Sequence, residues 1–281
     1  MSNKIRVADD TALKLLTGRG FRFKKNLGQN FLFHPLLLEQ IADAAGIAAG
    51  DTVVEAGAGA GSLTAVLADR GAKVIAIELD RALIPFLQER FKACPDVEII
   101  QGDVMKLDPD AYAPSYKMCA NIPYNISTSF VDRAFRQLRG LESGAILLQR
   151  ETADKVVALP GQEGYGLPAL AAAWYGEVKR DISIPPEFFI PRPRVDSALI
   201  TFRRRSQDAG VDARVLWLVV RGLFNQRRKN LHNGFKSLGA LTPANGISWA
   251  EALEAAAVDS RRRPETLSLA EFTAILKAAG Y

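Results

Sequence analysis

A glycine-rich turn and two acidic residues have the types and spacing to bind an adenosine-containing ligand. The chain runs Glu55-Ala56-Gly57-Ala58-Gly59-Ala60-Gly61, a backbone that can turn tightly and approach a ligand with no Cβ in the way. Glu78 ends the next apolar run, where a carboxylate could accept both hydroxyls of a ribose. Asp103 follows the run after that, where it or its neighbours could meet an adenine edge. Each feature alone also fits a structural turn or a solvated acid, but together they favour a nucleoside site at one edge of a sheet.

The spacing of these glycines separates two classes of nucleotide-binding protein. They follow the pattern GxGxG, whereas the dinucleotide-binding turn uses the wider GxGxxG to seat a pyrophosphate at the start of a helix. An NAD-dependent dehydrogenase is therefore disfavoured. The sequence also has no GxxxxGK[ST] segment, which removes the P-loop kinases and ATPases.

A second segment, Asn121-Ile122-Pro123-Tyr124, combines groups that could present an amine for alkylation. The N6 amine of adenine is a poor nucleophile because its lone pair is delocalised into the ring. The Asn121 side-chain carbonyl and the backbone carbonyl of Ile122 or Pro123 could each accept one N6–H and aim the lone pair at a methyl donor. Tyr124 could stack on the base, a contact worth roughly 1–3 kcal/mol. The plain alternative is a turn at the end of a strand, where Asn and Pro are common.

These residues lie at the ends of short β-rich runs that alternate with amphipathic segments. We expect strands at 52–55, 73–77, 97–100, 116–119 and 145–148. Between them, apolar residues recur at helical spacing at 62–70, 81–91 and 127–138, and Ser127 is placed to cap the last helix. Strands that alternate with helices predict right-handed βαβ units and a parallel sheet covered on both faces.

The last third of the chain changes from strands to helices. Residues 177–184 and 197–203 are expected to be strands separated by a proline-rich loop. After Arg205 the pattern is helical, at 213–224, 226–238, 249–256 and 268–278. We therefore expect a first domain of residues 1–206 and a helical domain of residues 207–281.

Composition indicates an ordinary globular protein and excludes several kinds of enzyme. The 281 residues are 48% hydrophobic and 24% charged, and a chain of this length folds without disulfides or a structural metal. Two cysteines outside any CxxC pair and two histidines argue against a disulfide framework, a zinc site and a His-centred triad. The first twenty residues lack the apolar core of a secretory signal, and the most apolar stretch, 167–175, is too short to cross a bilayer. We expect a cytoplasmic protein with no metal site.

Basic residues are concentrated in two blocks although the net charge is only +5. Residues 4–25 contain seven basic residues against two acidic ones, and residues 203–236 contain nine against two. Two such blocks suggest a polyanionic partner, while a solvated surface explains a charge run alone about equally well.

At Asn121-Ile122-Pro123-Tyr124 the chain resembles the class I S-adenosylmethionine-dependent methyltransferases. More narrowly, it resembles the bacterial ribosomal RNA small subunit adenine N6,N6-dimethyltransferases. The match runs nearly end to end and includes, besides the glycine turn, Leu27-Gly28-Gln29-Asn30-Phe31-Leu32, Phe189-Ile190-Pro191-Arg192-Pro193-Arg194-Val195-Asp196-Ser197, Leu223-Phe224-Asn225-Gln226-Arg227-Arg228-Lys229 and a Leu-Ser-Leu-rich stretch at 267–276.

The resemblance implies a Rossmann-like methyltransferase sheet, mostly parallel with an antiparallel edge strand, and a smaller C-terminal all-α domain. One departure concerns the turn, where the family often has an acidic-Ile-Gly-Pro-Gly sequence. This chain has Ala56, Ala58 and Ala60 there, and because all three are small the same turn is expected.

The resemblance also implies a role for each matching residue toward S-adenosylmethionine. The cofactor site would be formed by Asn30, Leu32, Gly57, Gly59, Glu78, Asp103 and Asn121. Asn30 and Leu32 would close over the methionine part of the cofactor. Glu78 would bind the ribose and Asp103 the adenine, while Asn121 would lie next to the methyl group.

For the target base, the resemblance implies that Asn121, Pro123, Tyr124 and Phe189 are the catalytic residues, with the Pro123 carbonyl as the second acceptor. Phe189 matches the aromatic residue thought to sandwich the base against Tyr124. A core aromatic that caps the sheet explains Phe189 equally well, and Phe188 could exchange roles with it.

The substrate implied by the resemblance is small-subunit (16S) rRNA in a pre-30S particle, with two methyl groups added to adenine N6 during ribosome assembly by a monomeric enzyme. Because the base must leave its stack, an unpaired segment is the easiest target. Flanking phosphates would be gripped by Arg22, Lys24, Lys25, Arg227, Arg228 and Lys229.

Two alternatives stay open. Large-subunit rRNA adenine N6-methyltransferases of the macrolide-resistance type share the Asn-Ile-Pro-Tyr chemistry, although Asn225-Gln226-Arg227-Arg228 and Gly164-Tyr165-Gly166 look more like the small-subunit group. A non-catalytic RNA-binding assembly factor could use the same fold, but such a protein could lose the acidic and Asn-Ile-Pro-Tyr positions freely.

Overall fold

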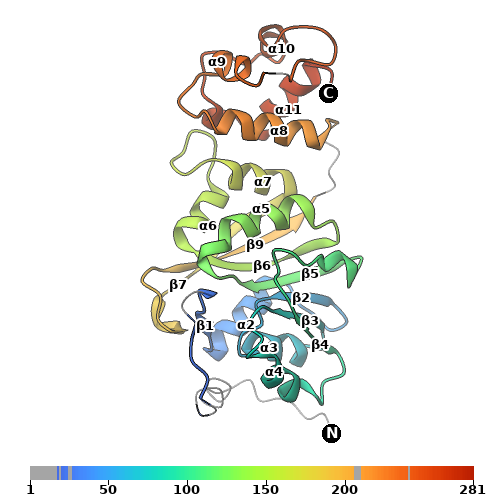
Figure 1. Ribbon diagram of the computed structural model, residues 1–281, viewed down its shortest axis with the longest axis vertical. Coiled ribbons are helices and arrows are strands. Elements are labelled where there is room, and N and C mark those ends of the chain that lie inside the picture. Colours follow the sequence, from blue (N-terminus) through green and yellow to red (C-terminus); the bar gives the residue numbers. More distant parts are fainter. Residues whose placement is uncertain (1–17, 19, 25–26, 206–209, 240) are drawn as a thin grey trace. The chain divides into compact units, whose positions relative to one another are not determined.

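A computed structural model describes residues 18, 20–24, 27–205, 210–239 and 241–281 (Figure 1). The chain divides into two compact units, one joining the chain up to Ala153 with Glu177–Arg204, the other joining Asp154–Gly176 with Arg205–Tyr281. The division after Arg204 lies beside the boundary expected at residue 206. The helical unit differs from the expected one because it also takes in Asp154–Gly176, whose Tyr165 hydroxyl donates to the Leu267 carbonyl at 2.7 Å.

A seven-stranded sheet in the order β4-β3-β2-β5-β6-β9-β7 forms the centre of the first unit. Its strands are β2 (Thr52–Ala56), β3 (Lys73–Glu78), β4 (Val97–Gln101), β5 (Tyr116–Asn121), β6 (Leu141–Gln149), β7 (Gly176–Ile184) and β9 (Ser197–Arg204). Strands β2 to β6 pair in parallel, and β9 runs antiparallel to β6. The parallel strands β2, β3 and β5 are apolar over most of their length because both faces of the sheet are covered. The expected mostly parallel sheet is confirmed.

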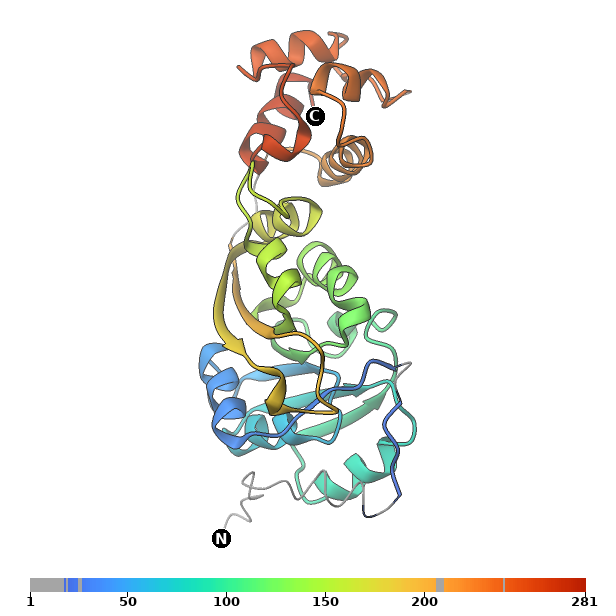
Figure 2. The ribbon, with the colours of Figure 1, turned by 90° about the vertical axis from the view of Figure 1, so that its left-hand side faces the viewer.

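Helices α3 (Ser62–Asp69), α4 (Ile84–Phe91) and α5 (Ser127–Gln137) connect parallel strands and pack on the sheet together with α2 (Pro35–Ala44), which precedes β2. Helix α6 (Arg150–Val157) follows β6, and there are short 3-10 turns at η2 (Pro109–Ala111), η3 (Tyr124–Ile126) and η4 (Pro186–Phe188). A two-residue strand β1 (Phe31–Leu32) pairs antiparallel with β8 (Phe189–Ile190). The segment ahead of α2, dark blue in Figure 2, therefore lies beside the gold loop between β7 and β9.

The second unit is helical in the part that the structure describes. It contains α7 (Leu167–Tyr175), α8 (Ala213–Phe224), α9 (Leu231–Lys236), α10 (Trp249–Ala255), η5 (Pro264–Thr266) and α11 (Leu269–Ala278). The helix predicted from residue 226 is wrong in its first turn. Because the Asn230 side chain accepts the Asn233 N–H at 3.0 Å, α9 begins only at Leu231. Over the described residues, no helix combines the length and apolar character that crossing a membrane requires.

Candidate active site

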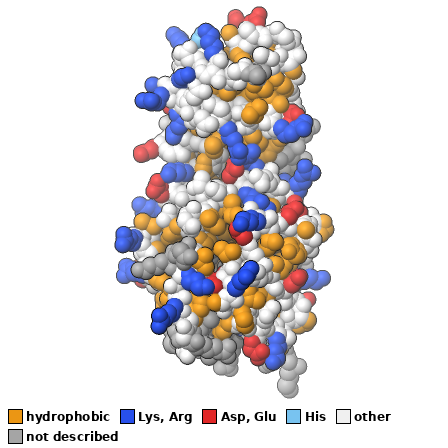
Figure 3. Space-filling view, in the orientation of Figure 1, with side chains coloured by type: hydrophobic (Ala, Val, Ile, Leu, Met, Phe, Trp, Pro, Cys, Tyr) orange, Lys and Arg blue, Asp and Glu red, His pale blue; other side chains and the backbone are white. Residues whose placement is uncertain are grey.

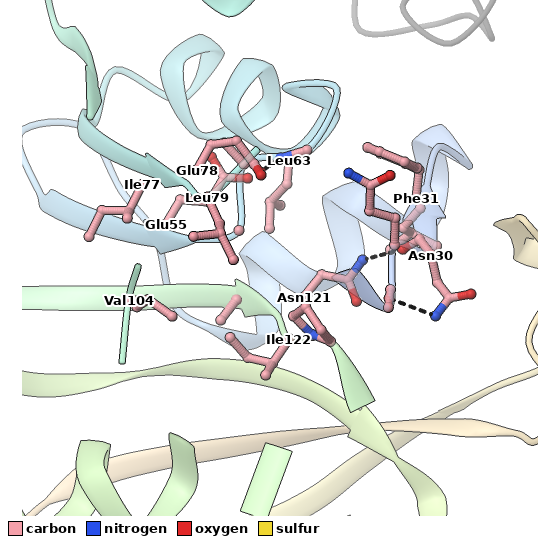
Figure 4. Close-up of a pocket in the computed structure, with 18 of the residues that line it drawn as sticks. Asn30, Phe31, Glu55, Leu63, Ile77, Glu78, Leu79, Val104, Asn121 and Ile122 are labelled. Carbon is pink, nitrogen blue, oxygen red and sulfur yellow. Dashed lines mark hydrogen bonds between the residues drawn. The ribbon is translucent and has the colours of Figure 1, made fainter. Parts of the chain in front are cut away.

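A pocket in the first unit opens where strands β2 to β5 end (Figure 4). Its walls come from the glycine turn after β2, from Glu78 at the end of β3, from Gly102–Val104 after β4 and from Ala120–Ile126 around the end of β5. Residues 27–32 complete it. Parallel strands bring their carboxyl ends to one edge, which is why these separate segments meet. The residues predicted to bind the cofactor all line this pocket, namely Asn30, Leu32, Gly57, Gly59, Glu78, Asp103 and Asn121.

Gly57 sits where two neighbouring strands constrain the turn. Its φ of +85° lies in the left-handed region, and a Cβ at this position would lie 3.2 Å from the Asn121 carbonyl oxygen. Its N–H donates to the Ile77 carbonyl at 2.9 Å. The turn therefore passes close to the ends of both β3 and β5, and a side chain at Gly57 would press on the Asn121 carbonyl.

The Glu78 carboxylate is fixed by backbone donors from two directions. One oxygen accepts the Gly59 N–H and the other accepts the Asp80 N–H, each at 2.7 Å. Burial raises the pKa of Glu78, and these N–H donors oppose that shift. A carboxylate has about four lone-pair directions, so acceptor capacity remains for a hydroxyl donor in the pocket.

Glu55 is a buried acid in the pocket wall to which the sequence assigned no role of its own. It is 1% exposed and accepts the Thr64 hydroxyl at 2.5 Å. Burial raises the pKa of Glu55 to about 8, the hydrogen bond from Thr64 opposes the shift, and the charge of Glu78 adds to it. Glu55 is therefore mostly protonated at neutral pH.

Asp103 lies at the rim of the pocket beside apolar side chains. Its Oδ1 accepts the Met105 N–H at 2.9 Å, and its Oδ2 lies 3.7 Å from the Lys106 ammonium. Leu79 and Val104 also line the pocket, and Leu79 is exposed. A flat ring could contact these apolar groups while its edge meets Asp103.

Asn121 ends β5 with its side-chain amide held in one orientation. Its Nδ2 donates to the Asn30 carbonyl at 2.9 Å, and the Asn30 Nδ2 donates to the Gly28 carbonyl at 3.1 Å (Figure 4). Because the amide nitrogen is engaged on this side, the Oδ1 of Asn121 is the atom presented as an acceptor.

The Pro123 carbonyl, the other predicted acceptor, already receives two hydrogen bonds. The Ile126 N–H donates to it at 3.1 Å and the Ser127 hydroxyl at 3.3 Å. The prediction that Ser127 caps α5 is wrong, because Ser127 is the first helical residue and Ile126 occupies the cap position. Its hydroxyl bonds back to the Asn-Ile-Pro-Tyr segment instead.

Tyr124 lines the pocket and is held by a residue far away in the sequence. Its hydroxyl lies 2.5 Å from the Ser197 hydroxyl, and Ser197 is fully buried at the start of β9. Burial raises the pKa of Tyr124, and the bond to Ser197 opposes that shift. The two segments Asn121–Tyr124 and Phe189–Ser197 thus meet through these two hydroxyls.

Phe189 is not brought to the pocket with the other predicted catalytic residues. It is 2% exposed, pairs with Leu32 in the β1–β8 ladder and belongs to the hydrophobic core. Phe188 is only partly buried and meets the ring of His34 edge-on at 4.9 Å. The reading of Phe189 as a core aromatic describes this structure, and stacking on a base requires it to leave the core.

The amino-terminal basic residues differ in their surroundings. Arg22 is exposed, and Lys25 lies outside the described residues. Lys24 forms an ion pair at 2.6 Å with Asp80, whose side chain is 1% exposed. The Lys24 ammonium is therefore bound to another part of the protein by an ion pair that the sequence did not predict.

The basic residues of the helical unit lie in the turn between α8 and α9. Arg227, Arg228 and Lys229 are all exposed, and the Lys229 ammonium donates to the Ser237 hydroxyl at 3.0 Å. On the face of the molecule shown in Figure 3, lysine and arginine side chains are scattered among acidic and apolar ones.

Sequence reasoning missed three side chains that organise the site. Ser197 and Gln29 lie inside segments that carry the family resemblance, but their partners are distant in sequence. Asp80 belongs to none of those segments, and its position two residues after Glu78 is the only signal that could have indicated it.

The fold and the pocket define the class of protein. A mostly parallel sheet in this strand order, with a glycine turn, an acidic residue and an Asn-Ile-Pro-Tyr segment at the strand ends, is a Rossmann-like methyltransferase domain. The sequence profile described as "Ribosomal RNA adenine dimethylase" matches residues 20–274. The chain belongs to this family of enzymes.

Curated relatives agree with this assignment, and solved structures share the fold. A protein of Geobacillus thermodenitrificans named "Ribosomal RNA small subunit methyltransferase A" is 36% identical and covers 94% of both chains. One of the same name from Clostridium botulinum is 40% identical over 90% of this chain and 92% of its own. A crystal structure of a dimethyladenosine transferase from Plasmodium falciparum has a TM-score of 0.76 at 24% identity, covering 88% of this chain and 96% of that one. The 23S rRNA methyltransferase ErmE has a TM-score of 0.66 at 24% identity, covering 90% and 100%.

Proposed function

We propose that the protein transfers two methyl groups in succession from S-adenosylmethionine to N6 of adenines in small-subunit rRNA. Membership of the dimethylase family supports the reaction, and the names of the two bacterial relatives support the subunit. The observation that carries the proposal is the orientation of Asn121, whose amide nitrogen is held by Asn30 so that its oxygen is presented at the pocket.

The residues present in the pocket suit S-adenosylmethionine, which supplies an electrophilic methyl group when bound. Gly57 has no side chain, which lets a ligand approach the backbone of the turn closely. Glu78 keeps acceptor directions for ribose hydroxyls, and Asp103 would meet the adenine. Asn30 and Leu32 would hold the methionine part.

The chain's own residues would then position the amine. Asn121 would accept one N6–H, and the carbonyl of Pro123 or Ile122 would accept the other, so that the nitrogen lone pair points at the methyl group. Because the Pro123 carbonyl already accepts two donors, its use would require the Ser127 hydroxyl to turn away. No general base is needed, since the methylated ammonium is acidic and loses its proton readily.

The target base would stack on Tyr124, whose ring is held in place through Ser197. A second aromatic face from Phe189 would form only if that side chain left the core on RNA binding. Phe188, which is partly buried, is the alternative partner for the base.

Binding of RNA would use the exposed basic residues as phosphate contacts. Arg22 and the Arg227–Lys229 turn are exposed and suit this role, whereas Lys24 would first have to leave Asp80. The helical unit would select the substrate. We place the reaction on a pre-30S particle in the cytoplasm, carried out by a monomer.

Mass mapping of modified nucleosides tests the proposal and both alternatives. Unmethylated small subunits and, separately, large-subunit rRNA are incubated with the purified protein and labelled S-adenosylmethionine. N6,N6-dimethyladenine in the small subunit alone supports the proposal. Label in the large-subunit rRNA alone would favour the macrolide-resistance type, and binding to small subunits without turnover would favour an assembly factor.

A further inference from the structure

Asp80 lies next to the pocket but outside its lining, and it makes more contacts than a surface acid would. Its side chain is 1% exposed and follows Glu78 at the end of β3. Its Oδ1 accepts the Lys24 ammonium at 2.6 Å and the Ala82 N–H at 3.0 Å. Its Oδ2 accepts the Gln29 Nε2 at 2.8 Å.

These contacts close a ring. The Gln29 Oε1 accepts the backbone N–H of Lys24 at 2.8 Å, so both ends of the Gln29 amide and the carboxylate of Asp80 are engaged. Burial alone would raise the pKa of Asp80, but the hydrogen bonds from Lys24, Ala82 and Gln29 outweigh it and the pKa lies below its usual value. The carboxylate is therefore charged at neutral pH and holds two groups that precede β1.

Residues 27–32, which we call the strap, form one wall of the pocket. One residue after Gln29 the strap is also held by β5, because the Asn30 carbonyl accepts the Asn121 amide at 2.9 Å. Gly28 adopts a φ of +61°, and a Cβ there would lie 3.0 Å from the Asn125 Oδ1 and 3.2 Å from the Pro123 Cβ. The strap is thus held both by Asp80 after β3 and by the segment at the end of β5.

We infer that Asp80 is a positioning residue that clasps the strap over the cofactor and so sets the affinity for S-adenosylmethionine and the rate at which the cofactor is exchanged. Asp80 also acts on Glu78, since its own N–H donates to the Glu78 carboxylate at 2.7 Å. One residue therefore joins the proposed ribose-binding acid to the strap. This inference rests on the proposed function of the pocket.

An isosteric substitution tests the contacts of Asp80 without changing the volume of its side chain. Asp80→Asn keeps the volume and, with its oxygen in the place of Oδ1, the acceptor shared by the Ala82 N–H and the Lys24 ammonium, but it removes the charge and places an N–H₂ donor against the Gln29 Nε2. We expect the Kd and KM for S-adenosylmethionine to rise about tenfold or more, since charge-assisted hydrogen bonds are lost. The value of kcat at saturating cofactor should stay within about twofold, because uniform binding affects KM alone.

A second variant tests the same contact independently of whether Asp80→Asn folds. Lys24→Met removes the half-exposed partner of the clasp, and cofactor binding is measured by calorimetry without RNA, because Lys24 was also predicted to touch phosphates. It should raise the Kd in the same direction, and the double variant Lys24→Met/Asp80→Asn should lose less than the product of the two factors. Lys92→Met, which removes the exposed pair with Glu89, serves as the matched control and should bind the cofactor like the wild type.

The outcomes distinguish a failure of this inference from a failure of the proposed function. Amide hydrogen exchange of residues 27–32 in the cofactor complex should be faster in Asp80→Asn than in the wild type. Unchanged Kd and KM in both variants would overturn the clasp, and so would a fall in kcat with KM unchanged. If the wild type itself failed to bind S-adenosylmethionine, the proposed function would fail first.

Discussion

The hydroxyl groups of Tyr124 and Ser197 lie 2.5 Å apart although 73 residues separate them in the sequence. Ser197 is fully buried at the start of β9, so it offers a fixed partner to a tyrosine that lines the pocket. The contact joins the Asn-Ile-Pro-Tyr segment to the start of the antiparallel strand β9. It orients the ring on which the base is proposed to stack.

Removing either hydroxyl should slow methyl transfer without weakening cofactor binding. A neutral hydrogen bond contributes roughly 0.5–1.5 kcal/mol, so we expect Ser197→Ala and Tyr124→Phe each to lower kcat by about 2- to 12-fold. Steady-state kinetics on small subunits measures this, with calorimetry for the cofactor. The double variant should be no slower than the worse single one, and fully multiplicative losses would contradict the contact.

Asn121→Ala should abolish transfer while sparing much of the cofactor binding. The substitution removes the acceptor for N6–H, and loss of such a positioned group lowers kcat by about a hundredfold or more. The bond to Asn30 is lost too, so the Kd for S-adenosylmethionine should rise modestly. Label incorporation into RNA and calorimetry check the two effects, and near wild-type activity would show that Asn121 does not hold the amine.

The stability of the protein should fall as pH rises, because of Glu55. Its pKa is about 8 in the folded protein against 4.5 for the free side chain, so its contribution is complete below pH 4.5 and is lost as pH rises toward and through 8. The slope contributed by one such group approaches about 1.4 kcal/mol per pH unit at most. Urea unfolding of the wild type and of Glu55→Gln at several pH values measures it.

In Glu55→Gln that part of the slope should disappear, while the Thr64 hydroxyl keeps an acceptor. A slope of the same sign should remain, because burial also raises the pKa of Glu78. Identical pH profiles for the two proteins would show that Glu55 is ionised in the folded state.

Gly57→Ala should weaken cofactor binding in a way that a matched glycine substitution does not. Gly57 and Gly46 both have positive φ, but only at Gly57 would a Cβ meet a neighbour, the Asn121 carbonyl oxygen at 3.2 Å. The backbone cost of each substitution is about 1–2 kcal/mol. Both variants should therefore melt at a lower temperature, whereas only Gly57→Ala should raise the Kd for S-adenosylmethionine. Equal affinity in both variants would mean that the turn does not approach the ligand.

Binding to small subunits should depend on salt through the turn between α8 and α9. Replacing both Arg227 and Arg228 by Ala should weaken binding and reduce the slope of log K against log salt by about 1.4 to 1.8. Filter binding at several salt concentrations measures the slope. Arg214→Ala is the control, because this side chain is 92% exposed in the same unit but pairs with Asp212. A slope unchanged by the double substitution would remove the turn from the RNA contact surface.

Local sequence patterns predicted the sheet and the pocket because both depend on neighbouring residues. Apolar runs separated by helical spacing determine βαβ order, and parallel strands necessarily gather their ends. Glu78, Asp103 and Asn121 therefore reach one pocket, as predicted. The predicted start of α9 is wrong because the side chain of Asn230 caps the first turn of this helix, a local bond that helical periodicity does not reveal.

By itself the sequence determined the fold class, the order of the elements and which strand ends carry polar groups, since these follow from periodicity and from residue types a few positions apart. Only the tertiary structure decided that Phe189 lies in the core, that Lys24 pairs with Asp80 across 56 residues, and that Asp154–Gly176 joins the helical unit. Such contacts are selected by the packing of distant segments and by burial, which no short stretch of sequence contains.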